Sequence, residues 1–214
     1  MPSNSHPESL ERLLSGVRHF CRNEYPQRQE AYDQVTREGQ RPHTLFVTCA
    51  DSRIDPELIT QSGPGDIFVA RNIGNIVPAY GEMMGGVSAV VEYAVSALEV
   101  DQVVVCGHAD CGAMRGLLNQ ETLGGMPAVQ NWLQNSHAAL SIADALHSRD
   151  DRSHFLDELT RQNVLLQVSH IKTHPSVAGR AAQGRLAVYG WIYDFQSGCV
   201  LMYDEDAKQF VTIT

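Results

Sequence analysis

The chain has 214 residues, of which 43% are hydrophobic, with a formal net charge of −9. This length can bury one good-sized core, so we expect a single domain spanning residues 1–214. The acidic balance, without a basic stripe, excludes nucleic acid as a partner. A polar, acidic N-terminus and the lack of an uncharged apolar run of about 18 residues argue against export and against a membrane span. The five cysteines are an odd number, which favours a reducing compartment and therefore the cytoplasm.

The N-terminal segment 1–40 is predicted to form a helical arm. Apolar residues recur at helical spacing from Leu10 to Cys21, and Pro26 interrupts the pattern before a second, polar helix that stops at Gly39. An amphipathic arm of this kind has little core of its own to bury against. It packs either on another subunit or on its own domain, and the sequence leaves both interpretations open.

The remainder, residues 41–214, is predicted to form an α/β core. Continuous apolar runs, typical of parallel strands buried on both faces, occur at 44–48, 67–70, 102–106 and 186–193. A helical pattern separates the second run from the third, and a last strand is expected near 200–203. We therefore expect an α/β fold with a mostly parallel four-stranded sheet in the order 2-1-3-4, an added antiparallel edge strand, flanking helices and the N-terminal helical arm.

Two tight clusters of metal-ligand residues follow two of these strands. Cys49 and Asp51 come after the first strand, and His108 and Cys111 come after the third. Thiolate, imidazole and carboxylate are the ligands that zinc accepts, and a set with one carboxylate is unusual among closed structural sites. Because ligands bind beyond the carboxyl ends of parallel strands, neighbouring first and third strands would bring the four residues together.

The carboxylate in this set suggests chemistry at the metal. If Asp51 moves away from zinc, a bound water has a lowered pKa and supplies hydroxide to an electrophilic carbon near neutral pH. Arg53 can hold the displaced carboxylate through its planar fork, so Asp51 and Arg53 form a possible switch. In the alternative interpretation, Arg53 is a surface arginine and Asp51 a turn residue. Because two thiolates donate much charge to the metal, we expect activity to improve on the alkaline side.

At these residues the chain closely resembles the β-class carbonic anhydrases, and within that class the plant-type branch, which includes bacterial enzymes encoded beside cyanate-degrading genes. The similarity runs from about Gln27 to Tyr203. Its separate motifs occur in the expected order, at 49–53 (CADSR), 64–72 (PGDIFVARN), 86–94, 106–112 (CGHADCG) and 190–194 (GWIYD).

The resemblance implies a zinc-dependent reversible hydration of carbon dioxide to bicarbonate and a proton. It implies one zinc ion per subunit on Cys49, His108 and Cys111, with Asp51 as a further ligand in the closed form. In the active form Asp51 pairs with Arg53 and accepts a hydrogen bond from the zinc-bound water. The Asp–Arg dyad would thus gate the metal.

The resemblance also implies the substrate-binding residues and the assembly. Gln40 and the Gly112 amide would orient bicarbonate. Gln40, Phe68 and Tyr93 would reach the cleft of a neighbouring subunit, so the expected assembly is a homodimer or a dimer-based tetramer.

Two positions depart from the family pattern. Phe46 stands where another branch has the tryptophan that helps to hold a regulatory bicarbonate, although Arg71 and Tyr193 match that branch. Phenylalanine cannot donate the hydrogen bond of the tryptophan side chain, which is worth about 1 kcal/mol. We therefore predict no bicarbonate inhibition of that kind. Asp110 replaces a small neutral residue, and we expect it to be a solvated turn residue or a helix N-cap.

Other classes of function stay open. The zinc could be structural, could serve a bicarbonate sensor without turnover, or could serve a hydrolase of a small linear substrate such as carbon disulfide. Arg53 and Gln40 favour catalysis, because a structural site needs neither. Cys106 is expected to be a buried core thiol rather than a further ligand.

Overall fold

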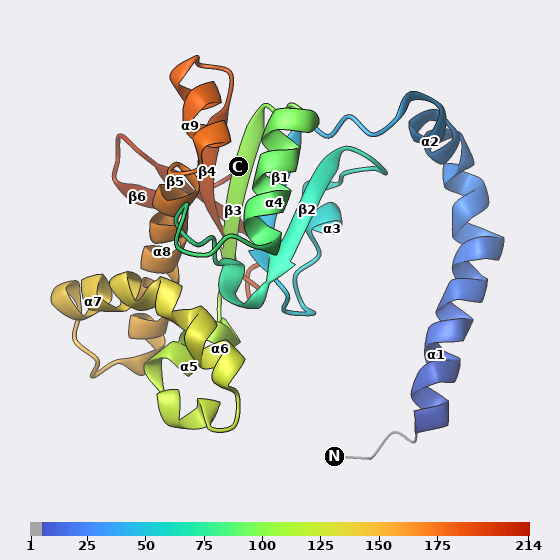
Figure 1. Ribbon diagram of the computed structural model, residues 1–214. Helices are drawn as coiled ribbons and strands as arrows, with labels where there is room; N and C mark the ends of the chain where they lie inside the picture. Colours follow the sequence, from blue (N-terminus) through green and yellow to red (C-terminus); the bar gives the residue numbers. More distant parts are fainter. Residues whose placement is uncertain (1–5) are drawn as a thin grey trace.

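A computed structural model describes residues 6–214, and this part of the chain is built around one six-stranded sheet (Figure 1). The strand order is β2-β1-β3-β4-β5-β6, in which β2, β1, β3 and β4 are parallel and β5 and β6 are antiparallel. The strands are β1 (Thr44–Cys49), β2 (Ile67–Asn72), β3 (Gln102–His108), β4 (Ala187–Tyr193), β5 (Val200–Asp204) and β6 (Gln209–Thr212). The predicted α/β fold and the order 2-1-3-4 are confirmed. The antiparallel extension, however, has two strands rather than one.

Central strands β1 and β3 are buried on both faces, as their continuous apolar runs predict. Leu45 and Val47 face the helices α4 (Gly86–Glu92), α8 (Arg152–Ile171) and α9 (Pro175–Ala182). Phe46 points to the opposite face, where it packs in a smaller cluster near the short helix α3 (Pro56–Thr60). The site-bearing ends of these strands are therefore held rigidly from both sides.

A second group of helices lies at the carboxyl ends of the parallel strands, below the sheet in Figure 1. It comprises α5 (Gly112–Leu118), α6 (Pro127–Leu133) and α7 (His137–Leu146), which pack with α8 around Met114, Leu133, Phe155 and Leu159. Short helical turns η2 (Ile73–Asn75), η3 (Tyr93–Ala97), η4 (Gln120–Leu123) and η5 (Gln134–Ser136) link the longer elements. Cys49 and Cys111 belong to this same cluster, so the helices enclose the edge of the sheet where the two cysteines lie.

The N-terminal arm is helical, as predicted, and stands apart from the sheet in Figure 1. It consists of α1 (His6–His19), the π-helical turn η1 (Phe20–Glu24) and α2 (Tyr25–Glu38). Pro26 lies in the first turn of α2, where a missing N–H costs little, so the helical path continues through it. Leu13 and Val17 of α1 are 69% and 59% exposed, so the apolar face of α1 is not covered by its own domain. Within residues 6–214, no helix is long and apolar enough to cross a membrane.

Candidate metal centre

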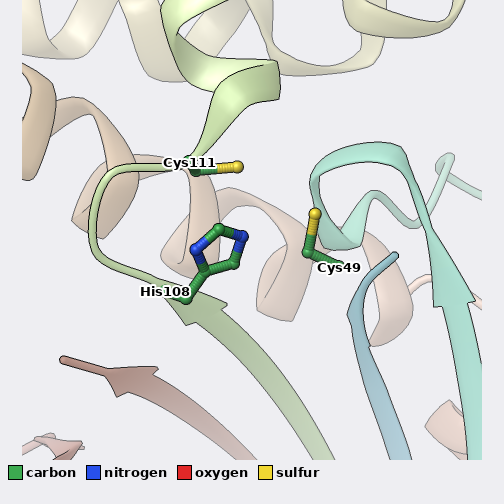
Figure 2. Close-up of side chains that lie close together, drawn as sticks. All are labelled: Cys49, His108 and Cys111. Carbon is green, nitrogen blue, oxygen red and sulfur yellow. The ribbon is translucent and has the colours of Figure 1, made fainter. Parts of the chain in front are cut away.

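Three buried side chains with metal-binding atoms meet at the carboxyl ends of β1 and β3. Cys49 ends β1, His108 ends β3, and Cys111 directly precedes α5. Because β1 and β3 are parallel neighbours, their ends lie side by side. The two sulfurs and a ring nitrogen of His108 all lie within 4.8 Å of one another, and Figure 2 shows the sulfurs directed toward each other with the imidazole beside them. The structure thus brings together three of the four residues predicted as ligands.

His108 has the orientation of a ligand. Its Nδ1 lies 2.8 Å from the Ala109 carbonyl oxygen, which can only accept, so Nδ1 carries the proton. The lone pair is then on Nε2, which is buried and has no hydrogen-bond partner. A buried nitrogen without a partner is costly unless something binds it. Nitrogen and two sulfurs in this arrangement are a donor set that suits zinc.

The two thiols are electrostatically unequal without a metal. A hydrogen bond from Cys111 is the main cause that lowers the pKa of Cys49 to about 4, with a smaller effect of the Gly74 amide, against the opposing effect of burial. The pKa of Cys111 is raised well above its ordinary value, because its proton is held by the Cys49 sulfur and because it is buried. The two sulfurs therefore share a proton that a divalent cation would displace.

Asp51 is paired with Arg53. The guanidinium donates from Nε to Oδ1 at 2.9 Å and from Nη2 to Oδ2 at 2.7 Å, and the Arg53 backbone N–H donates to Oδ1 at 3.0 Å. These bonds hold the pKa of Asp51 well below its usual range, and the carboxylate in turn raises the pKa of Arg53. Asp51 Oδ2 lies 3.9 Å from His108 Nε2. The carboxylate is therefore beside the centre but turned to the arginine, and its role as a metal ligand stays a prediction.

Asp110 holds the other side of Arg53. Its Oδ2 accepts from Arg53 Nη1 at 3.1 Å, its carbonyl accepts from Nη2 at 3.3 Å, and its Oδ1 also pairs with Arg115. The guanidinium also lies over the Phe195 ring, 4.6 Å from its centroid. Asp110 is a turn residue with a side chain 41% exposed, as expected, but it is not a helix N-cap, because Cys111 occupies that position of α5. Sequence reasoning missed this anchoring role, and it had no signal for Phe195.

Arg71 is already engaged by the backbone around the site. Its Nε donates to the Cys49 carbonyl at 3.1 Å, and its Nη2 donates to the carbonyls of Asp51 and Ile54 at 2.7 and 2.9 Å. Phe46 is buried and packs edge-on against Trp191, with ring centroids 5.9 Å apart. The absence of inhibition by a regulatory bicarbonate stays a prediction.

The predicted substrate-binding residues lie in three separate parts of the described chain. Gly112 lines a cavity of about 1480 Å³ together with Arg53. Phe68 and Tyr93 pair elsewhere, with ring centroids 6.0 Å apart, and Tyr93 is 51% exposed. Gln40 is exposed in the link between α2 and β1. A single described chain does not bring these residues into one cleft, so their shared role stays a prediction.

The fold and the site together define a class of protein: a parallel α/β sheet that carries a Cys–His–Cys metal centre beside an Asp–Arg pair. The sequence model of the family described as carbonic anhydrase matches residues 44–200. A carbonic anhydrase of Synechococcus elongatus is 45% identical over 193 residues, which cover 90% of this chain and 71% of the relative.

Solved structures agree with the sequence comparisons. The β-carbonic anhydrase CcaA superposes with a TM-score of 0.92 at 39% identity, covering 96% of this chain and 92% of the other. One of two tetrameric β-carbonic anhydrases from Sordaria macrospora gives a TM-score of 0.79 at 28% identity, covering 91% and 96%. The chain therefore belongs to the β-class carbonic anhydrases, enzymes that hydrate carbon dioxide, and the resemblance seen in the sequence is confirmed.

Proposed function

We propose that this chain catalyses the zinc-dependent reversible hydration of carbon dioxide to bicarbonate and a proton, with Asp51 and Arg53 as the gate of the metal. One zinc ion per chain would be held by Cys49, His108 and Cys111. The observation that carries the proposal is the free Nε2 of His108 facing two buried sulfurs while Asp51 is turned to Arg53. Three protein ligands are the number found in catalytic zinc sites, whereas structural sites have four.

Zinc bound here would supply the Lewis acidity that makes water a nucleophile near neutral pH. The protein's part is orientation. The lowered pKa of Asp51 keeps its carboxylate ionised, so it can only accept a proton in a hydrogen bond and cannot donate one. Its Oδ2 faces the metal centre while Arg53 fixes the carboxylate plane by two bonds. Asp51 would therefore hold the attacking water in one orientation.

Stopped-flow measurement of carbon dioxide hydration tests this assignment. We expect Arg53→Ala to lower kcat/KM about 100-fold, because the carboxylate loses its fixed orientation. Arg180→Ala is the control, since Arg180 bonds Glu99 and does not line the cavity that Arg53 lines. Zinc content is measured for every variant. Normal hydration by zinc-loaded Arg53→Ala protein would remove the gate from the proposal.

We also propose that the chain works as a homodimer or a dimer-based tetramer. The exposed apolar face of α1 supports this, because Leu10, Leu13 and Val17 need a cover that their own domain does not provide. The tetrameric relatives from Sordaria macrospora support it as well. A neighbour could then supply Phe68 and Tyr93 to a shared cleft. Light scattering should give a dimer or larger for the wild type and a smaller species for Leu13→Glu; a monomeric wild type would contradict the proposal.

We propose a cytoplasmic location. All five cysteines are free, and two of them belong to the metal centre, where oxidation to a disulfide would destroy the site. Cell fractionation with a periplasmic marker tests this location, and recovery in the exported fraction would contradict it.

A further inference from the structure

The segment 73–80 runs beside the metal centre and is held along its length by polar side chains from α8 and the turn that follows it. Asn163 Nδ2 donates to the Gly74 carbonyl at 3.1 Å, and Gln167 Oε1 accepts from the Val77 amide at 2.9 Å. Further along, His170 bonds the Val77 carbonyl at 2.9 Å and His174 bonds the Pro78 carbonyl at 3.1 Å. Asn163, Gln167 and His170 recur at helical spacing, so one face of α8 forms hydrogen bonds with this segment, and His174 adds a bond from the turn that follows.

The same segment touches a predicted metal ligand at one point. The Gly74 amide donates to the Cys49 sulfur at 3.4 Å. The peptides around this amide are fixed from both sides, because Trp132 Nε1 donates to the Ile73 carbonyl at 2.8 Å and Asn163 binds the Gly74 carbonyl. The direction of the amide therefore depends on side chains that lie outside the centre itself.

Asn163 is set in a buried polar network. It is 1% exposed, and its Oδ1 accepts from Ser136 Oγ at 2.8 Å and from Gln167 Nε2 at 3.0 Å. Gln167 is fully buried, and its Nε2 also lies 3.3 Å from the Asn135 carbonyl. A buried network of this kind is rigid when every member is satisfied. Two of its outward bonds, those to the Gly74 carbonyl and the Val77 amide, end on the backbone of 74–77, so the network acts on that segment.

We propose that Asn163, supported by Ser136 and Gln167, is a positioning residue for the metal centre. It fixes the Gly74 peptide so that the amide donates to the Cys49 sulfur and holds this ligand in the geometry that zinc requires. Asn163 touches neither the metal nor the substrate and acts only through Gly74. The inference rests on the zinc site of the proposed function, and it adds a residue on α8 that retains the metal.

The test measures zinc release to an excess of a chromophoric chelator. Asn163→Leu keeps the side-chain size and removes the bond to Gly74, and Ser136→Ala removes a supporting bond more gently. We expect release to be about 10- to 100-fold faster in Asn163→Leu, the usual range for residues that orient a ligand, with a smaller increase in Ser136→Ala. Thr160→Val is the control, because Thr160 is buried on α8 and its hydroxyl bonds only its own helix, at Leu156.

The outcomes separate this inference from the proposed function. Wild-type protein without stoichiometric zinc would refute the zinc site itself. If the wild type holds zinc, release from Asn163→Leu within about twofold of the wild-type rate overturns the positioning role, and so does equally fast release from Thr160→Val. Should Asn163→Leu fail to fold, Ser136→Ala decides: an unchanged release rate overturns the inference. Cobalt-loaded protein adds a second readout, since its thiolate-to-cobalt band should shift in Asn163→Leu and not in Thr160→Val.

Discussion

Gly74 is a position beside the metal centre where the structure predicts a strong response to a single methyl group. Its φ is +80°, a left-handed conformation that costs a residue with a side chain about 1–2 kcal/mol. A Cβ built on Gly74 would also lie 2.9 Å from the Cβ of Ala113 in α5, which is too close for two carbon atoms. Gly74→Ala therefore meets two separate penalties.

Gly81 provides a control for the first penalty. Its φ is +93°, but a Cβ there would meet nothing within 4 Å. Gly81→Ala should thus show the conformational cost alone, about 1–2 kcal/mol of unfolding free energy. Gly74→Ala should add the cost of overpacking, about 1–3 kcal/mol, for a total of about 2–5 kcal/mol.

Urea unfolding of the zinc-free variants measures these differences. The double variant Gly74→Ala/Ala113→Gly removes the contact between the two methyl groups, so it should recover part of the loss even though glycine itself weakens α5. Equal destabilisation by Gly74→Ala and Gly81→Ala would refute the reasoning, because it would mean that the segment moves away from α5 without cost. The same result would weaken the view that 73–80 is held rigidly over Cys49.

Three further predictions concern the site. Asp110→Ala should lower kcat/KM for hydration by at most about fivefold, far less than Arg53→Ala, because an exposed ion pair contributes little and the two bonds between Asp51 and Arg53 remain. A loss as large as that of Arg53→Ala would assign Asp110 a direct role. Burial raises the pKa of Cys106 to about 12, so this thiol should resist alkylation at pH 8 in native protein while the exposed Cys21 reacts, as peptide mass mapping can show. The pKa of Asp51 is depressed in the folded state, so its contribution to stability is present above about pH 4 and is lost as the pH falls. Urea unfolding of zinc-free protein should therefore show a smaller loss between pH 5 and 3 for Asp51→Asn than for the wild type, and equal losses would contradict the pairing.

Much of the fold could be predicted because its central strands are buried on both faces. Continuous apolar runs such as 44–48 and 102–106 have few other interpretations, and the two ligand clusters required the first and third strands to be neighbours. Strand β6 was missed because its four residues are at most partly buried and carry no such run. The position of the arm could not be predicted either. An amphipathic pattern indicates that one helix face must be buried, but it does not indicate which surface buries it.

The metal-binding side chains could be predicted because their chemistry is visible in single residues. Two clusters of cysteine, histidine and aspartate, each at the end of a strand, indicate a metal from residue types and spacing alone. The anchoring of Arg53 by Asp110 and Phe195 depends instead on tertiary placement, and arginine followed at a distance by an acid or an aromatic residue is common in any sequence. These contacts therefore became visible only in three dimensions.

Helix α8 shows why residues that support a site are the hardest to recognise in a sequence. Polar residues such as Asn163 and Gln167 on a helix ordinarily indicate a solvent-facing side, yet here they are buried. The reason lies in the segment 73–80, which is not paired in the sheet while its N–H and C=O groups still require partners. Side chains of α8 supply those partners, so the polar face of the helix points inward to unpaired backbone. A buried polar stripe on a helix next to a ligand-bearing strand is thus evidence for a positioned loop, and Asn163→Leu tests that interpretation directly.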